Sequence, residues 1–419
     1  MIAGAGSRAA VAAFAVTLAA AALAMPSAEA QTYKVLHTFM PGRDGREPSA
    51  SLFLHRDEIF GTTYAGGGRY DGGTVFSIDK VGTETVLHSF RGWGGVHDGG
   101  GVGLPGTLVH DRAGNLYGTT YEGGASGNGV VFKLDLAGRE TVLHNFLGTD
   151  GSNPYAGLIG DAARNPYGTT GYGGESNCGS LYNNEGCGTV FKMDQTGRET
   201  LLYSFKFGAD GAQPYGSLIR DAAGNLYGTT TGGGNYNCPT GCGIVFKVDP
   251  NGVETEPYVF TGGRDGAIPF GGVALDAAGN LYGTTSAGGA YSEWGTVFRL
   301  DASGHETVLY NFTGGADGGG PFSGLTRDVA GNLYGTTEFG GDLSCHLFGA
   351  QGCGIVFKLD TAGKETVLHA FTGRSDGATP MGGLIVDSAG NLYGTASERG
   401  DLSCDVRHIG CGVVFEITP

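Results

Sequence analysis

The sequence has few cations for its length, and it lacks the short motifs of common catalytic sites. It holds 25 Lys and Arg against 41 Asp and Glu, a net charge of −16. A surface of this sign repels nucleic acid and anionic lipid. No G-x-S-x-G, H-E-x-x-H or P-loop motif occurs, and no pair of histidines has metal-site spacing. We therefore expect no nucleic-acid partner and find no sequence signature of an enzyme.

Long hydrophobic runs are also missing, except for one at the N-terminus. Arg8 precedes an apolar stretch over residues 9–24, and the small residues Ala28 and Ala30 flank Glu29 before Gln31. This pattern is typical of a secretory signal, and the run is too short and too alanine-rich for a membrane span. We predict a signal peptide over residues 1–30 and a secreted or periplasmic protein without membrane insertion. We see no C-terminal anchor.

What the sequence does contain is one tetrapeptide in seven copies, Y-G-T-T or a close variant. The copies are 50 to 60 residues apart and start at Phe60, Tyr117, Tyr167, Tyr227, Tyr282, Tyr334 and Tyr393. In the fourth unit, strand-like segments cover residues 216–221, 225–230, 243–249 and 254–260, with Gly, Asn and Asp between them. A period of this length with strand-like content is typical of a β-propeller. We predict an all-β fold, a seven-bladed β-propeller with four antiparallel strands per blade, as a single domain over residues 31–419.

The two ends of the chain predict how the ring closes. Residues 33–39 match the fourth strand of a unit, for example residues 84–90. Residues 412–417 match the third strand, and the last unit has no fourth strand of its own. The N-terminal strand is therefore expected to join the last blade, which removes the edges that an open array would expose.

Three segments carry a resemblance to a known family. They are the D-x-A-G-N-L-Y-G-T-T core, the G-T-V-F-K-L-D strand and the E-T-V-L-H-x-F strand, and they recur over essentially all of residues 31–419. The pattern resembles the GloVer tandem repeat of exported bacterial proteins. The resemblance implies a bacterial, exported, propeller-like protein. It brings no established activity and no catalytic residues.

Eight cysteines occur, and all are in the expected loops between the second and third strands. They form close pairs in four units: Cys178 and Cys187, Cys238 and Cys242, Cys345 and Cys353, Cys404 and Cys411. In an exported chain this spacing favours four local disulfides, each worth roughly 2 to 2.7 kcal/mol in the chain-entropy treatment. Zinc held by four thiolates of adjoining units is the alternative.

Each connection between units carries an Asp-Gly step. The aspartates are Asp44, Asp98, Asp150, Asp210, Asp265, Asp317 and Asp376. A ring of carboxylates can hold calcium, but an Asp at the start of a turn also caps its own loop backbone. We favour the capping interpretation and predict no cofactor or metal, with calcium as the alternative.

Large residues follow the proline in the same connections. They are Tyr155, Tyr215, Phe270, Phe322 and Met381. Aromatic rings around a concave mouth stack on sugars, and rings between blades only pack. Trp93 and Trp294 break the repeat, which makes them the strongest single candidates for ligand contact.

The long, variable connections share one end of a propeller, here named the loop face, and the short hairpin turns form the opposite turn face. Because binding residues concentrate on loops of a rigid scaffold, we hypothesise a non-enzymatic, monomeric binding or structural scaffold. Its loop face would engage a glycan or a protein partner. The alternative is a hydrolase or lyase at the central mouth that uses loop acids and histidines: Glu122, Glu175, Glu293, Glu338, Glu398, His97 and His346.

Overall fold

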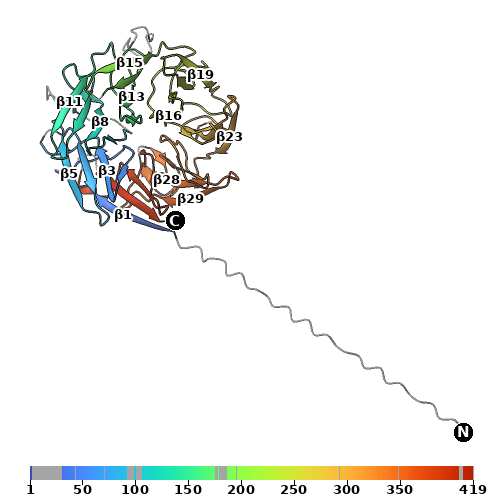
Figure 1. The fold of residues 1–419 in the computed structure, drawn as a ribbon. Helices are drawn as coiled ribbons and strands as arrows, with labels where there is room; N and C mark the ends of the chain where they lie inside the picture. Colours follow the sequence, from blue (N-terminus) through green and yellow to red (C-terminus); the bar gives the residue numbers. More distant parts are fainter. Residues whose placement is uncertain are drawn as a thin grey trace. The chain divides into compact units, whose positions relative to one another are not determined.

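The chain forms a ring of β-sheets (Figure 1). The structure is a computed structural model that describes residues 1, 31–42, 44–69, 71–91, 99–100, 106–174, 178, 186–194, 196–291, 293–347, 349–404 and 409–418. Met1–Ala30 and Gln31–Pro419 are separate units, and the predicted signal segment lies outside the described residues except for Met1. None of the helices in the described part of the chain has the length and hydropathy needed to cross a bilayer.

The described strands form seven four-stranded antiparallel sheets, which are the predicted blades. Blades 1 to 4 are β2 (Phe53–His55), β3 (Glu58–Thr63), β4 (Thr74–Ile78), β5 (Glu84–Ser89); β7 (Val109–His110), β8 (Leu116–Thr120), β10 (Val130–Leu134), β11 (Glu140–Asn145); β12 (Ile159–Gly160), β13 (Pro166–Thr170), β14 (Thr189–Met193), β15 (Glu199–Ser204); β16 (Ile219–Arg220), β17 (Leu226–Thr230), β18 (Ile244–Val248), β19 (Glu254–Val259). Blades 5 to 7 are β20 (Ala274–Leu275), β21 (Leu281–Thr285), β22 (Thr296–Leu300), β23 (Glu306–Asn311); β24 (Thr326–Arg327), β25 (Leu333–Thr337), β28 (Ile355–Leu359), β29 (Glu365–Ala370); β30 (Ile385–Val386), β31 (Leu392–Ala396), β32 (Val413–Thr418), β1 (Thr32–Thr38). The loops add the two-stranded pairs β6 (Gly99–Gly100) with β9 (Glu122–Gly123) and β26 (His346–Leu347) with β27 (Ala350–Gln351), and the 3-10 turn Leu402–Cys404.

The predicted ring closure is confirmed. β1 pairs antiparallel with β32, so the N-terminal strand completes the sheet β1-β32-β31-β30. Blade 7 also contacts blade 1 near the axis, where the Thr395 hydroxyl donates to the Ala50 carbonyl at 3.3 Å. Figure 1 shows the blue first strand beside the red end of the chain.

The Y-G-T-T repeat has a packing cause in every blade. A Cβ added to Gly118 would lie 2.7 Å from the ring of Phe132 and 2.8 Å from Leu108, and the other six copies are as tight. The glycine therefore leaves room for a fully buried phenylalanine from the third strand. The first threonine of the repeat forms a hydrogen bond to the neighbouring blade. The Thr229 hydroxyl, for example, donates to the Gly271 carbonyl at 2.9 Å.

The Asp-x-x-Gly-Asn turns between the first and second strands are structural as well. In blade 2 the Asp111 carboxylate accepts backbone N–H groups of Ala113 and Asn115, the Asn115 amide and the Tyr117 hydroxyl. Burial alone raises the pKa of Asp111, but these hydrogen bonds outweigh burial and lower it. Blade 1 lacks this arrangement. Its link is the two-residue turn Arg56–Asp57, and Phe60 has no hydroxyl to donate.

Candidate functional site

The central channel is narrow and chemically plain. It has a volume of about 210 Å³ and is lined mainly by residues that lead into the innermost strands of several blades. Its lining consists of serine, threonine, glycine and small aliphatic residues such as Ser51, Thr107 and Gly271, with no acid, histidine or cation among the described residues. Any chemistry at the centre must therefore come from the loops above it.

Aromatic side chains from five connections meet at the loop-face end of this channel. The ring centroids are 5.6 Å apart for Tyr121 and Tyr155, 4.7 Å for Tyr155 and Tyr215, 5.1 Å for Tyr215 and Phe270, and 5.3 Å for Phe270 and Phe322. We name these five residues the aromatic row. All five are half-buried. Phe270 and Phe322 directly precede Gly271 and Ser323 of the channel wall, so the row lies at the mouth.

Four of these rings were predicted from the sequence, whereas two partners, Tyr121 and Tyr172, were not. The Tyr215 hydroxyl donates to the Tyr172 hydroxyl at 2.8 Å. Burial, followed by this hydrogen bond, raises the pKa of Tyr215 well above its usual range, so it stays neutral. Tyr121 is the residue directly after its Y-G-T-T copy, and Gly171 at the same position lies against Tyr215. The residue directly after each Y-G-T-T copy was therefore the feature of the sequence from which Tyr121 could have been predicted.

Among the acids proposed for catalysis, Glu338 combines a place beside the mouth with a raised pKa. It follows the Y-G-T-T copy of blade 6, the place that Tyr121 holds in blade 2. Burial raises the pKa of Glu338 to about 7. Glu122, Glu293, Glu398 and His346 lie in other loop positions, and none joins a cluster of three metal-type ligands among the described residues. Glu175 and His97 lie outside the described residues, as do Trp93 and Asp98.

The four predicted cysteine pairs are disulfides: Cys178–Cys187, Cys238–Cys242, Cys345–Cys353 and Cys404–Cys411. Their Cα atoms lie 5.1 to 5.7 Å apart. Two of the disulfides support the next connection directly. Cys238 and Cys242 pack against Gly262, and Cys345 and Cys353 pack against Gly373.

We expect the unreduced, denatured protein to titrate no free thiol. Replacing both Cys345 and Cys353 by serine should lower the free energy of unfolding by about 2.5 kcal/mol, because the loop that they close gains freedom in the unfolded chain. Thiol titration and denaturant unfolding measure the two effects. Eight reactive thiols in the unreduced protein would contradict the assignment.

Trp294 has a packing role that the repeat concealed. It stands two residues before the third strand of blade 5, the position that Cys242 and Cys353 hold in blades 4 and 6. Its backbone carbonyl accepts the N–H of Gly320, as the carbonyl of Cys242 accepts that of Ile268. Its indole covers Gly314 and Gly319. The indole of Trp294 therefore stands where a disulfide stands in the neighbouring blades.

The described loop aspartates cap their own connections. Asp265 accepts the Thr261 N–H at 2.7 Å and the Tyr258 hydroxyl at 3.1 Å, and Asp376 accepts the Thr372 N–H and the His369 ring. Because the tyrosine or histidine partner belongs to the outermost strand, the carboxylates are spread around the rim and do not gather at the axis. These contacts support capping. Among the described residues, the single group with three metal-type ligands within 4.8 Å is His37, Asp44 and Glu84.

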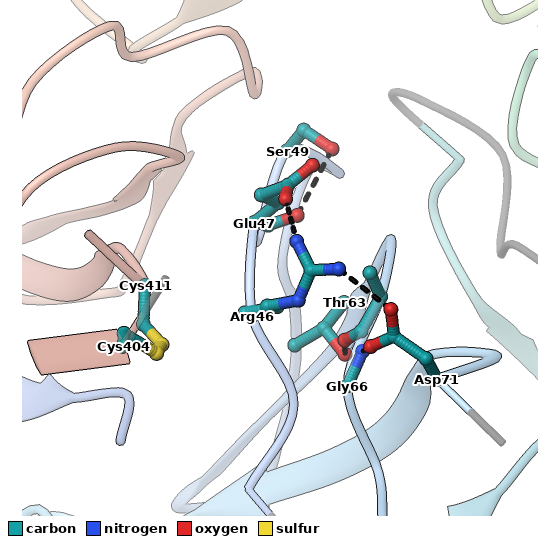
Figure 2. A network of polar contacts seen from close by, with 9 residues as sticks. Arg46, Glu47, Ser49, Thr63, Gly66, Asp71, Cys404 and Cys411 are labelled. Carbon is teal, nitrogen blue, oxygen red and sulfur yellow. Dashed lines mark hydrogen bonds and ion pairs between the residues drawn. A yellow bond between two sulfur atoms is a disulfide. The ribbon is translucent and has the colours of Figure 1, made fainter. Parts of the chain in front are cut away.

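A polar network lies on the loop face of blade 1 (Figure 2). Arg46 forms ion pairs with Glu47 and with Asp71, the latter at 2.6 Å. Asp71 also accepts the Gly66 N–H at 2.7 Å. The Glu47 N–H donates to the Cys411 carbonyl at 3.0 Å, so the network links the first connection to the disulfide loop of blade 7.

One solved structure with a TM-score above 0.5 supports the fold. The extracellular domain of a proposed hybrid two-component system of B. thetaiotaomicron aligns with a TM-score of 0.55 and 11% identity over 93% of this chain. This chain spans 41% of that protein's length. A gluconolactonase of Xanthomonas campestris aligns with a TM-score of 0.40 and 15% identity over 70% of this chain and 82% of its own. The PQQ-bound aldose sugar dehydrogenase of Streptomyces coelicolor gives 0.42 and 13% over 93% and 98%.

No curated protein matches the chain. The recurrent segments described above do match one repeat family, in two adjoining stretches, residues 23–182 and 182–408. Those stretches contain all seven Y-G-T-T copies, and the same segments build the seven blades of the ring. The chain therefore belongs to the family of the Gloeobacter/Verrucomicrobia repeat.

Proposed function

We propose that this protein is a binding propeller that acts outside the cytoplasm, secreted or periplasmic, and holds a neutral glycan at its loop-face mouth. The aromatic row carries the proposal. Its five rings follow one another at centroid distances of 4.7 to 5.6 Å, and all of them are half-buried, so each keeps some exposed surface. Rings at such a mouth offer the apolar faces on which sugar rings stack.

The surroundings of the row favour a neutral ligand. The net charge of −16 disfavours an anionic glycan. The channel wall below the row offers the hydroxyl group of Ser217 and no charged group among the described residues. The disulfides hold the neighbouring loops in place, which lowers the conformational entropy lost on binding. The scaffold therefore supplies a rigid, uncharged platform.

The test is an array of neutral oligosaccharides, followed by calorimetry with the best hit. We expect Phe270→Ala to weaken binding by about tenfold, the loss of one stacking partner, and Tyr121→Ala to weaken it similarly. Tyr236→Ala is the matched control, because Tyr236 is an exposed aromatic residue away from the row. Equal affinities for all three variants, or no glycan bound at all, would contradict the proposal. The thermal midpoint of each variant separates lost binding from lost folding.

Glu338 favours a second candidate, a hydrolase or lyase at the same mouth. A carboxyl with a pKa near 7 is suited to general acid catalysis. This alternative predicts that turnover of the bound glycan is lost in Glu338→Gln while the glycan still binds. Glu293→Gln, at an exposed loop position, is the control. Binding without turnover by the unmodified protein favours the scaffold over the enzyme.

A further inference from the structure

The junction between blades 7 and 1 brings three metal-type ligands together. His37 lies on β1, the N-terminal strand that closes the ring, and Glu84 begins β5 of blade 1; Figure 1 labels both strands. Asp44 lies in the connection that follows β1. One imidazole nitrogen and one oxygen of each carboxylate all lie within 4.8 Å of one another. The three ligands thus come from two blades and from the link between them.

Close backbone packing holds the two blades together beside these ligands. Gly82, in the turn before β5, has a φ of 92°, and a Cβ added there would lie 2.3 Å from the Leu36 carbonyl oxygen of β1. The His37 ring packs edge-on against Phe39, with centroids 4.8 Å apart. The side chains of His37 and Asp44 are 13% and 22% exposed. The ligands therefore lie at a tightly packed junction and are largely shielded from water.

The His37 imidazole lacks the hydrogen bond that its equivalents make. In five other units, the histidine or tyrosine at this position bonds to the aspartate of the following connection at 2.8 to 3.2 Å. These pairs are Tyr203–Asp210, Tyr258–Asp265, Tyr310–Asp317, His144–Asp150 and His369–Asp376. The His37 Nε2 atom lies 3.4 Å from Asp44 Oδ2 and is buried with no hydrogen-bond partner among the described residues. A buried nitrogen in this state needs an explanation, and a bound ion is one.

Glu84 completes the group, and the repeat explains why other described junctions differ. The Oε1 atom of Glu84 is buried with no hydrogen-bond partner in the described part of the chain. At the junction of blades 6 and 7, Tyr33 takes the place of this glutamate. The junction of blades 2 and 3 has a histidine, an aspartate and a glutamate, but there His144 already bonds to Asp150 at 3.0 Å. That junction is therefore the natural comparison for the one between blades 7 and 1.

The geometry and the ligand types fit zinc. Ligand atoms of a tetrahedral zinc site with bonds of about 2.1 Å lie about 3.4 Å apart, and His37 Nε2 and Asp44 Oδ2 have a separation of 3.4 Å. An imidazole ligand disfavours calcium and magnesium, which take oxygen ligands. Among the described residues Asp44 accepts one N–H, from Met40 at 3.2 Å, so its carboxylate keeps lone pairs for an ion. The cysteines are all in disulfides and offer no competing thiolate.

We propose that His37, Asp44 and Glu84 bind one zinc ion at the junction of blades 7 and 1, with water in the fourth position. The two carboxylates balance the charge of the ion, and the neutral imidazole supplies the nitrogen ligand. The ion ties β1 to blade 1 and so stabilises the closure of the ring. This site is separate from the glycan site at the mouth and does not depend on it.

The test is zinc binding to the full chain, purified without an affinity tag and treated with EDTA. Calorimetry and elemental analysis should find one zinc per chain. Zinc at a hundredfold excess over its Kd should raise the thermal midpoint by about 3 °C, and the same concentration of magnesium should not. A chain without a saturable zinc site overturns the proposal.

His37→Tyr is the sharpest variant, because three other units have tyrosine at this position. The repeat therefore accepts the change, and the new hydroxyl can donate to Asp44 as Tyr258 donates to Asp265. We expect this variant to lose both the bound zinc and the zinc-dependent rise in the midpoint. His144→Tyr is the matched control and should keep both. Equal zinc binding by His37→Tyr and the unmodified chain, or equal loss in the two variants, would overturn the assignment.

A second pair of variants keeps the test decisive if His37→Tyr does not fold. Glu84→Gln should weaken zinc binding at least about tenfold, because even groups that only orient a metal ligand are worth that much. Glu199→Gln, at the equivalent position in blade 3, should leave the affinity unchanged. Equal affinities in these two variants would remove Glu84 from the site and overturn the proposal. Phe270→Ala at the mouth should bind zinc normally, so failure here is distinguishable from failure of the glycan proposal, and midpoints measured in EDTA verify that each variant is folded.

Discussion

Replacing Gly228 by alanine should lower the free energy of unfolding by about 3 kcal/mol, at the upper end of ordinary overpacking. The added Cβ would lie 2.5 Å from Cζ of Phe246 and 3.1 Å from Leu218. Phe246 is fully buried and cannot move away without displacing its neighbours. Chemical denaturation, read by tyrosine fluorescence or circular dichroism, measures the change.

Gly160→Ala is the control for this prediction. Gly160 lies on β12, is exposed, and has no atom within 4 Å of an added Cβ. Its φ is not left-handed, so alanine should be neutral or stabilise by about 0.5 kcal/mol through the unfolded chain. If both substitutions cost the same, the glycine of Y-G-T-T does not act through the space that Phe246 needs.

The second large effect is a gain in stability at mildly acidic pH. Five of the glutamates that begin outer strands at blade junctions have raised pKa values: Glu84, Glu199, Glu254, Glu306 and Glu365. Burial raises their pKa values to about 7 or, for Glu254, about 8, with a further contribution from a nearby carboxylate. In each of them Oε1 is buried with no hydrogen-bond partner among the described residues.

The sign follows from linkage. A carboxyl with a raised folded-state pKa contributes stability that is complete below its unfolded value of 4.5 and is lost as the pH rises through 7 to 8. His37 and His55 have the opposite effect on the pH dependence of stability, because burial lowers their pKa values. The five glutamates outnumber these two histidines. The glutamates are partly exposed, so solvent screening reduces the effect. We expect the thermal midpoint at pH 5 to exceed that at pH 8 by about 5 °C.

The matched variants decide whether these glutamates cause the effect. The triple change Glu199→Gln, Glu306→Gln and Glu365→Gln should raise the midpoint at pH 8, leave it nearly unchanged at pH 5, and so flatten the profile. Glu293→Gln, an exposed loop residue, should leave the profile as it is. A pH profile that is the same in the triple variant would assign the effect to other groups.

Most of the architecture was predictable from the sequence, because the same residues pack in the same way in each blade. The glycine and the buried phenylalanine recur in the same order in every unit, with the capping aspartate in all units but the first, so one unit such as residues 216–260 predicts the phase of all seven. The register of residues 33–39 and 412–417 likewise predicted the pairing of β1 with β32. The disulfides were predictable because both cysteines of each pair lie in one loop.

The candidate sites were harder to predict from the sequence, because they depend on which blades lie next to one another. The sequence identified Tyr155 and Tyr215 as equivalent residues, but not that they touch each other and Phe270 across blades. Trp294 looked exceptional, although it fills the space that a disulfide fills elsewhere. The sequence shows that the link at Asp57 is shorter than in the other units. It does not show how large a space the missing turn leaves in the folded protein.

The sequence by itself determined the number of blades, their phase, the closure of the ring and the cysteine pairs. Local spacing carries that information, because each strand and turn packs chiefly within its own repeat. Only the tertiary structure decided where unequal repeats meet: the aromatic row at the mouth and the three metal-type ligands at the junction of blades 7 and 1. Both features depend on how the side chains of different blades fill the space between those blades. That filling is decided only when the ring has folded.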